Sequence, residues 1–242
     1  MYLRMEIRLN KYLSDSGFCS RREADRIIEN GQVYINGVKA AIGQKVSEND
    51  IVSVDGKEIK KQDKLILIAL NKPEGIECTT DKRNKDNIVD YIGMDERIFP
   101  IGRLDKNSCG LILLTNKGDI SDKMMRGSNN HEKEYIVTVN KPVTDDFIKK
   151  MSNGIHIVDK EHNIDTVTKK CKVWKIIEYN FGIILTQGIN RQIRRMCKYL
   201  SYNVTKLKRI RIMNIQIGKL PEGKYRNVSE EEIKVLFSKL NM

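Results

Sequence analysis

Residues 100–118, PIGRLDKNSCGLILLTNKG, contain a carboxylate in a position typical of a catalytic group. Asp105 follows Arg103 and Leu104 and precedes a glycine and an apolar run, which places it on a loop at the end of a strand. Catalytic carboxylates often occupy such loops, and an ionised carboxylate can act as a nucleophile or a general base. A carboxylate that only caps a turn would fit the same spacing. Spacing alone therefore leaves both interpretations open.

Two later segments contain residues that could act with this carboxylate. Tyr135 begins the apolar run YIVTV, and its ring could stack on a base or pack in the core. Between Ile189 and Arg211 the chain has eight basic residues and no acidic residue, which predicts a phosphate-contacting surface. The eight are Arg191, Arg194, Arg195, Lys198, Lys206, Lys208, Arg209 and Arg211. One or two of them could instead be ordinary exposed helix charges.

The first sixty residues predict a small α/β unit with a basic helix pair. Two short helices are expected, the second with Ser20 as its N-cap and Glu23 completing a capping box. A strand and a hairpin at Asn36-Gly37 follow. The helix pair contains five basic residues: Arg8, Lys11, Arg21, Arg22 and Arg26. They could grip RNA phosphates, or they could form a solvated charged face, because acidic residues are nearly as numerous.

A polar stretch over 61–64 predicts a linker between domains 1–60 and 65–242. In the second domain, strands are expected at 65–73, 110–115, 135–139, 170–176 and 182–187, and helices at 145–151, 191–200 and 230–240. Strands and helices do not alternate regularly. The fold class is therefore predicted to be α+β, with a largely antiparallel, mixed sheet flanked by helices.

The composition indicates a globular protein that attracts polyanions. The net charge is +12, and residues 61–242 hold 34 basic against 23 acidic residues. No apolar run is long enough to span a membrane and no secretory signal is visible, so the expected location is the cytoplasm. The five cysteines and three histidines show no metal-ligand spacing, so no metal is expected. Glycine-rich loops that bind dinucleotides, methyl donors or nucleotide phosphates are also missing, and no cofactor is expected.

Two stretches of the chain resemble known families. Residues 8–56 resemble the S4 RNA-binding domain, through Ser20, Arg21 and Ala24 and the strand Gly31–Gly37. The string GRLD followed by GLILLTNKG resembles the active-site segment of the pseudouridine synthases, and KEYIVTV and QGINRQIRRM match two further motifs in the same order. The similarity runs over nearly the whole chain. It is greatest to the branch that modifies ribosomal RNA and carries an N-terminal S4 domain, and within it to the RluF type.

This resemblance implies a role for each candidate residue. Asp105 would act as nucleophile or base on a flipped uridine, with Arg194 as its salt-bridge partner and Arg191 as the alternative. Tyr135 would stack on the exposed base, and Arg103 would hold the displaced backbone open. Further RNA contacts are expected from Arg191, Arg195, Lys198, Leu207, Lys208 and Arg209, and from Lys11, Arg21 and Arg22 in the first domain. For Leu207, core packing is an equal alternative to a contact under the base.

The resemblance also implies partners and leaves rival functions to be compared. The substrate would be large-subunit ribosomal RNA or a pre-ribosomal particle, with transfer RNA as a second possibility, and the protein would be a monomer that needs no cofactor. A non-catalytic RNA-binding protein on the same fold would share the charge and the S4-like domain. Such a protein would not need the carboxylate, the tyrosine and the arginine, all of which are present. A different RNA enzyme is the second rival, and the missing glycine-rich loops argue against it.

Overall fold

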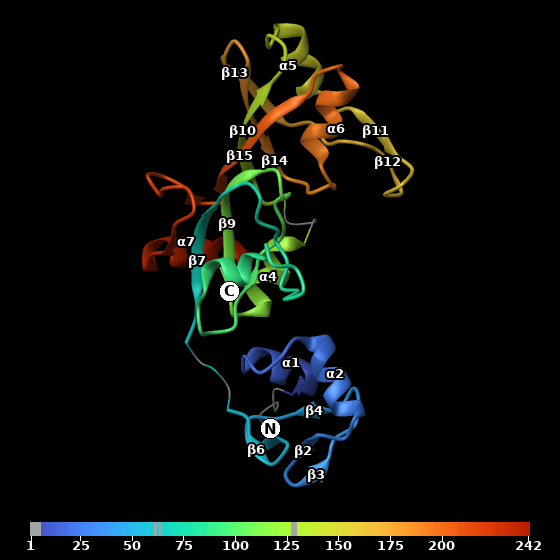
Figure 1. The fold of residues 1–242 in the computed structure, drawn as a ribbon, viewed down its shortest axis with the longest axis vertical. Coiled ribbons are helices and arrows are strands. Elements are labelled where there is room, and N and C mark those ends of the chain that lie inside the picture. The colour runs from blue at the N-terminus through green and yellow to red at the C-terminus, as the bar shows by residue number, and fades with distance from the viewer. Residues whose placement is uncertain (1–5, 61, 63, 127–129) are drawn as a thin grey trace. The chain divides into compact units, whose positions relative to one another are not determined.

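The computed structural model describes residues 6–60, 62, 64–126 and 130–242. The chain divides into two compact units (Figure 1). The first consists of Met1–Ile66, Met94–Ile98 and Asn116–Gly118, and the second of Leu67–Gly93, Phe99–Thr115 and Asp119–Met242. Of the predicted linker, Lys61 and Asp63 lie outside the described residues. No helix in the described part of the chain is long and apolar enough to cross a membrane.

The N-terminal unit packs two helices on short antiparallel strands. The helices are α1 (Leu9–Asp15) and α2 (Arg21–Glu29). One sheet has the order β3-β2-β5-β6, and the other pairs β1 with β4. These strands are β1 (Ile7–Arg8), β2 (Val33–Ile35), β3 (Val38–Lys39), β4 (Lys45–Val46), β5 (Val52–Val54) and β6 (Lys57–Glu58). The buried core includes Leu9, Leu13, Ala24 and Ile28 from the helices, and both of the short helices expected from the sequence are present.

The local signals predicted for this unit are largely present. Ser20 caps α2 by accepting a hydrogen bond from the Glu23 backbone N–H at 3.1 Å. The Glu23 carboxylate pairs with Arg26 at 3.1 Å, so the expected capping box is formed on one side only. Asn36 and Gly37 have φ values of 51° and 80°, the left-handed pair that a tight two-residue hairpin requires.

A nine-stranded sheet forms the centre of the second unit. Its strand order is β13-β14-β10-β15-β9-β7-β17, with β16 paired to β15 and β8 paired to β9. The strands are β7 (Leu67–Lys72), β8 (Phe99–Pro100), β9 (Cys109–Thr115), β10 (Lys133–Val139), β13 (Lys172–Ile177), β14 (Asn180–Leu185), β15 (Val204–Ile212), β16 (Ile215–Gln216) and β17 (Tyr225–Asn227). Every strand pair described in this sheet is antiparallel except β15 with β9, which confirms the predicted α+β class.

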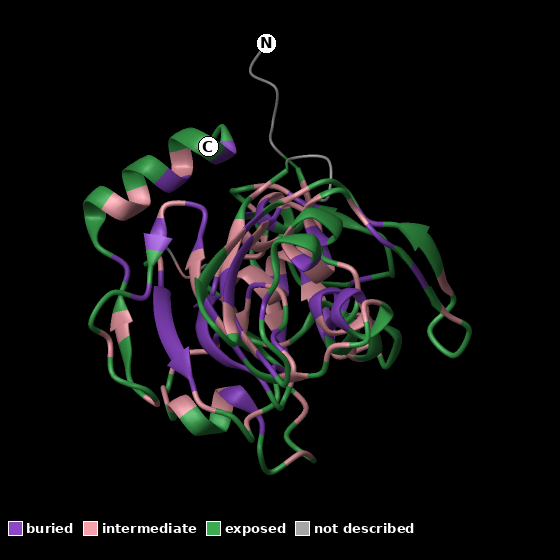
Figure 2. Ribbon diagram, turned by 90° about the horizontal axis from the view of Figure 1, so that it is seen from above, coloured by how far each residue is buried: buried purple, intermediate pink, exposed green. Residues whose placement is uncertain are grey.

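Helices and one separate hairpin flank this sheet. They are α3 (Ile88–Ile92), α4 (Gly118–Met125), α5 (Asp145–Ser152), α6 (Gln192–Tyr199), α7 (Glu230–Leu240) and the hairpin of β11 (His156–Asp159) with β12 (Ile164–Val167). Strands β7 and β9 of this sheet are wholly buried, whereas α7 buries Leu236 and Leu240 and exposes its other side (Figure 2). Ser229 begins α7 with a complete capping box, and the helix bounds match the predicted 230–240.

The longest strand of the sheet, β15, is missing from the sequence prediction. Its sequence, VTKLKRIRI, alternates basic and apolar residues, and the net charge of this stretch favours an exposed surface. In the structure it lies between β10 and β9, with Leu207, Arg209 and Ile212 buried. The basic residues of β15 therefore lie partly inside the protein, where they can help to shape a site.

Gly110 lies where β9 meets β15 and tolerates no side chain. A Cβ atom there would lie 2.2 Å from the Arg209 carbonyl oxygen, and φ is +104°. We expect Gly110→Ala to lower the free energy of unfolding by about 3 kcal/mol, through strain and displaced backbone. Urea unfolding followed by the fluorescence of the single tryptophan, Trp174 on β13, reports on this unit. Gly188→Ala is the control, because a Cβ there meets nothing within 4 Å. It should change the free energy of unfolding by less than about 0.5 kcal/mol.

Candidate active site

A cleft of about 900 Å³ opens in the second unit. It is lined by the loop 101–108, the start of β10, the segment 187–194 and part of β15. Six Lys and Arg side chains line it against two carboxylates, Glu77 and Asp105. Of the five buried polar side-chain atoms that lack a hydrogen-bond partner in the described part of the chain, three line this cleft: His131 Nε2, Arg194 Nε and Arg209 Nη2. Unpartnered polar atoms are costly, so their concentration here indicates a site built for a polar ligand.

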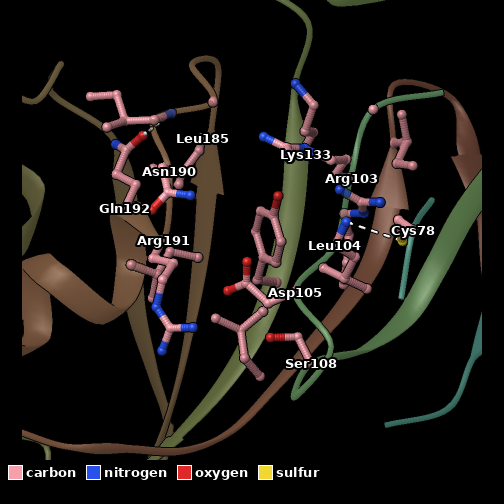
Figure 3. Close-up of a pocket in the computed structure, with 18 of the residues that line it drawn as sticks. Cys78, Arg103, Leu104, Asp105, Ser108, Lys133, Leu185, Asn190, Arg191 and Gln192 are labelled. Carbon is pink, nitrogen blue, oxygen red and sulfur yellow. Dashed lines mark hydrogen bonds between the residues drawn. The ribbon is translucent and has the colours of Figure 1, made fainter. Parts of the chain in front are cut away.

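Asp105 lies on the loop between β8 and β9, with its side chain about one-third exposed in the cleft. Its backbone carbonyl accepts a hydrogen bond from Ser108 N–H at 3.0 Å, which closes a turn. The preceding residue, Leu104, donates its N–H to Cys78 Sγ at 3.4 Å (Figure 3). The backbone thus makes the turn while the carboxylate faces the cleft, so the side chain is not needed as a cap.

Arg194, on the first turns of α6, is the arginine that faces Asp105. Its Nε lies 3.9 Å from Asp105 Oδ2. Its Nη2 donates to the Asn107 carbonyl at 2.7 Å and to Ser108 Oγ at 3.1 Å, which ties α6 to the loop that carries the carboxylate. Burial and the neighbouring Arg191 lower the pKa of Arg194, while Asp105 opposes that shift. Because an arginine stays protonated even so, the carboxylate has a fixed positive partner.

A buried lysine contacts the backbone of the loop that carries Asp105. Lys72, at the end of β7, is fully buried, and its ammonium donates to the carbonyls of Pro73 at 2.7 Å and Ile76 at 2.8 Å. The carbonyl of Lys106, directly after Asp105, lies 3.5 Å from the same nitrogen. Burial lowers the pKa of Lys72. Lys72 is not among the site residues predicted from the sequence, although a lysine that ends an apolar strand just before a proline is a signal that could have found it.

Tyr135 and Leu207 form the apolar part of the cleft. Tyr135 on β10 is 9% exposed and Leu207 on β15 is 6% exposed, and both line the cavity. Each side chain is therefore buried in the core and also lines the cleft. The two alternatives that the sequence left open, core packing and contact with a base, do not exclude each other. An apolar ring and a leucine in such a cleft provide surfaces on which a flat base can lie.

Arg103 and Arg191 are exposed residues at the cleft. Figure 3 shows Asp105 between them, with Arg191 on one side and Arg103 and Leu104 on the other. Arg191 has a left-handed backbone, φ 51°, immediately before α6. No ion pair joins Arg191 to Asp105 in the described structure, so Arg194 occupies the position for which Arg191 is the alternative.

The predicted phosphate-contacting surface is only partly open. Lys198 on α6 is exposed and Lys208 is partly buried. Arg195, in contrast, pairs with Asp159 of the β11–β12 hairpin and donates to the Asn190 carbonyl at 2.8 Å. Arg209 is 3% exposed and lies inside the cleft rather than on an outer surface. Placing Arg209 on an open surface is therefore wrong, because β15 is a central strand and one of its faces is buried.

The three basic residues of the first unit that are predicted to contact RNA lie on its two helices. Arg21 and Arg22 are exposed at the start of α2, and Lys11 on α1 pairs with Asp15 at 2.8 Å. This placement suits contact with a phosphate backbone. It remains a prediction.

A possible metal cluster lies outside the cleft. Ligand atoms of Asp159, Glu161 and His162 all lie within 4.8 Å of one another. Asp159 already pairs with the guanidinium of Arg195, and that positive charge opposes a second cation. The expectation that no metal is needed stays a prediction.

Comparisons with known proteins agree with these features. A family described as RNA pseudouridylate synthase matches residues 66–199, and the S4 domain matches residues 7–52. The dual-specificity RNA pseudouridine synthase RluF of Salmonella typhi is 56% identical over 232 residues, covering 95% of this chain and 78% of that protein. RluF of Escherichia coli strain K12 is 53% identical over 233 residues, covering 96% and 78%.

More distant proteins match over equally long stretches. The ribosomal large subunit pseudouridine synthase B of Bacillus subtilis is 30% identical and is covered over 95% of both chains. A crystal structure of a pseudouridylate synthase superimposes with a TM-score of 0.68 at 28% identity, covering 95% of this chain and 99% of that one. The family predicted from the GRLD, KEY and QGINRQIRRM segments is thus confirmed. The chain belongs to the RNA pseudouridine synthases that carry an N-terminal S4 domain, and it is an isomerase that acts on RNA.

Proposed function

We propose that this enzyme converts a specific uridine of large-subunit ribosomal RNA to pseudouridine, with Asp105 as the nucleophile. One observation carries the proposal: Asp105, its partner Arg194 and the ring of Tyr135 line a single cleft. A non-catalytic RNA-binding protein would have no use for a carboxylate facing such a cavity. The relatives named above are described as acting on RNA or on the large ribosomal subunit, which favours ribosomal RNA as the substrate.

The reaction needs a carboxylate and no cofactor. The bond from uracil N1 to C1′ breaks with its electron pair on the uracil, and the Asp105 carboxylate attacks C1′. The freed uracil turns, its C5 displaces the carboxylate from C1′, and the proton leaves C5 while N1 gains one. No electrons and no groups are exchanged with a donor. Asp105 ends as it began, which is the condition for a catalytic nucleophile.

The target nucleotide must leave its stack before the carboxylate can reach C1′. Extruding a base costs a few kcal/mol, and the enzyme must recover this in the cleft. The ring of Tyr135 and the side chain of Leu207 offer apolar surfaces on which the everted base can lie. Arg103, exposed beside Asp105, is placed to hold the RNA backbone from which the base was drawn.

We expect the flat ring of Tyr135, rather than its hydroxyl group, to contribute to the reaction rate. Tyr135→Phe keeps a stacking surface, and we expect it to retain activity within about tenfold of the wild type, whereas Tyr135→Leu should lose about 10- to 100-fold because base stacking is worth about 1 to 3 kcal/mol. Tritium release from RNA labelled at uridine C5 measures the rate. Tyr179→Leu, at an exposed tyrosine that is not among the residues lining the cleft, is the matched control and should behave as the wild type. Equal losses for Phe and Leu would contradict a stacking role.

The proposed division of labour follows the predicted domains. Residues 1–60 would position the RNA through Lys11, Arg21 and Arg22, residues 61–64 would link, and residues 65–242 would perform the isomerisation. Around the cleft, we assign Arg191, Arg195, Lys198, Lys208 and Arg209 to the RNA-facing side, with Arg195 acting through its hold on Asn190. We propose that the protein works as a monomer, since one chain contains the complete cleft.

Mapping of pseudouridine tests the substrate directly. Chemical mapping in total RNA from cells that lack this protein should show one or a few missing sites in large-subunit ribosomal RNA. Complementation with the wild type should restore them, and Asp105→Asn should not. Because the RluF relatives carry the name dual-specificity, transfer RNA is mapped in the same samples as a second candidate class. Unchanged maps in both RNA classes would overturn the proposal.

A further inference from the structure

Two cations that have no part in the bond-breaking and bond-forming steps above line the cleft together with Tyr135. Lys133 precedes the tyrosine by two residues on β10, and Arg209 is the tyrosine's register partner on β15. Both side chains line the cavity that contains Asp105. Figure 3 shows Lys133 on the same side of the cleft as Arg103. Lys133 is not among the site residues predicted from the sequence, and Arg209 is predicted there only as part of a phosphate-contacting surface.

Arg209 is held rigidly and yet has an unused donor. It is 3% exposed, and its Nε donates to the Leu111 carbonyl at 2.7 Å. Its guanidinium carbon lies 6.0 Å from the centroid of the Tyr135 ring. Gly110 on the neighbouring strand β9 lies close against the backbone of Arg209. Nη2 nevertheless has no hydrogen-bond partner in the described structure, so a donor at the edge of the cleft awaits an acceptor.

Lys133 is likewise a cation of the cleft whose charge is not paired among the described residues. The acidic side chains nearest to it on the chain, Glu132 and Glu134, both pair with Arg211, at 3.0 and 2.7 Å. No ion pair of Lys133 itself occurs in the described part of the chain. Burial lowers the pKa of Lys133, and repulsion from Arg209 adds to this. Two neighbouring cations without a carboxylate between them form a site for negative charge.

The position of the two cations indicates which negative charge they meet. RNA phosphates stay on the backbone, at the mouth of the cleft, where Arg103 and Arg191 are exposed. Arg209, in contrast, is buried beside Tyr135, where the base is to be stacked. Uridine is neutral when it binds, but the uracil becomes an anion when the N1 to C1′ bond breaks and the electron pair spreads to O2 and O4. Groups that interact more strongly with this anion than with bound uridine accelerate the bond cleavage.

We propose that Lys133 and Arg209 stabilise the detached uracil anion by hydrogen bonding to its carbonyl oxygens, which makes Lys133 a further catalytic residue. This rests on the proposed function and adds to it. The N1 to C1′ electron pair moves onto the uracil as C1′ bonds to the Asp105 carboxylate, and no proton leaves the lysine. The cations hold the charged ring while it turns, and the charge is consumed when C5 bonds to C1′, C5 loses its proton and N1 takes one up.

Substrates with leaving groups of different stability test the proposal. The mapped uridine is placed in two transcripts, one with uridine and one with 5-fluorouridine, whose fluorine makes the uracil anion intrinsically more stable. Consumption of the target nucleoside is followed by mass spectrometry of digested RNA, under single turnover with saturating enzyme. With uridine, Lys133→Met should be about 100-fold slower than the wild type, and Lys133→Arg less than about tenfold slower. With 5-fluorouridine, the deficit of Lys133→Met should shrink to less than about tenfold.

Controls separate this role from folding and from RNA binding. Lys175→Met, an exposed lysine on β13 of the same sheet, should match the wild type on both transcripts. The Kd for the uridine transcript should change less than about threefold in Lys133→Met. If its thermal melting shows that Lys133→Met is not folded, Lys133→Gln replaces it.

Two results would overturn the proposal. In one, the folded Lys133 variant reacts within threefold of the wild type; in the other, its deficit is the same for both transcripts. Failure of the proposed function is distinguishable, because the wild type itself would then leave the uridine transcript unchanged.

Discussion

Asp105→Asn abolishes isomerisation in the result we expect, with a loss on the order of 10⁴-fold or more in the single-turnover rate. An amide cannot donate an electron pair to C1′ as a carboxylate does, and the cleft offers Glu77 as its only other described carboxylate. Because the side chain is one-third exposed and its backbone makes the turn, the fold should tolerate the substitution. Tritium release from C5-labelled uridine in RNA from cells lacking the protein measures the rate.

Binding and folding are measured on the same variant. The RNA affinity of Asp105→Asn should change by less than about tenfold, because the contacts that we assign to RNA lie on other residues. Asp145→Asn is the matched control: this aspartate is exposed in the first turn of α5, outside the cleft, and its variant should match the wild type. Turnover by Asp105→Asn at the wild-type rate would show that another group attacks the ribose.

The order of elements could be predicted from the sequence because their signals are local. Ser20 and the Asn36-Gly37 turn act within a few residues, so their effects are visible in the chain itself. The helix over 230–240 is predicted to the residue because acidic residues and a serine mark its start. The family could be predicted because its motifs combine a carboxylate, a tyrosine and an arginine in a fixed order.

What could not be predicted depends on contacts between distant segments. β15 is a central strand, but its many basic residues are typical of an exposed segment. Only its pairing with β10 and β9 shows that Arg209 is buried. From the sequence, Arg195 is predicted to be free to contact RNA. In the structure it pairs with Asp159 of the β11–β12 hairpin. Lys133 gains its importance because Arg211 occupies the two glutamates beside it. In each case a neighbour far along the chain decides what a charged side chain is free to do.

Arg194 should be the second most sensitive position in the cleft. Its guanidinium bonds the Asn107 carbonyl, Ser108 Oγ and the Val204 carbonyl while its Nε faces Asp105 at 3.9 Å. We expect Arg194→Met to lose about 10³-fold in the single-turnover rate, because both the anchor of the loop and the charge beside the carboxylate are removed. Arg194→Lys should lose about 10²-fold, since an ammonium keeps the charge but cannot span those three acceptors.

The order of these variants distinguishes charge from positioning. Ser108→Ala removes one anchor of Arg194 and leaves its charge, so a loss of less than about tenfold is expected from it. Lys149→Met, an exposed cation on α5, is the control for the loss of one positive charge and should react as the wild type does. The Nε to Oδ2 distance of 3.9 Å is longer than a hydrogen bond, and catalytic contacts often shorten when substrate enters. If Arg194→Met and Arg194→Lys lose activity equally, the shape of the guanidinium and its hold on the loop matter more than its charge. If neither loses activity, the carboxylate needs no cationic partner and the pairing of Asp105 with Arg194 has no part in the reaction.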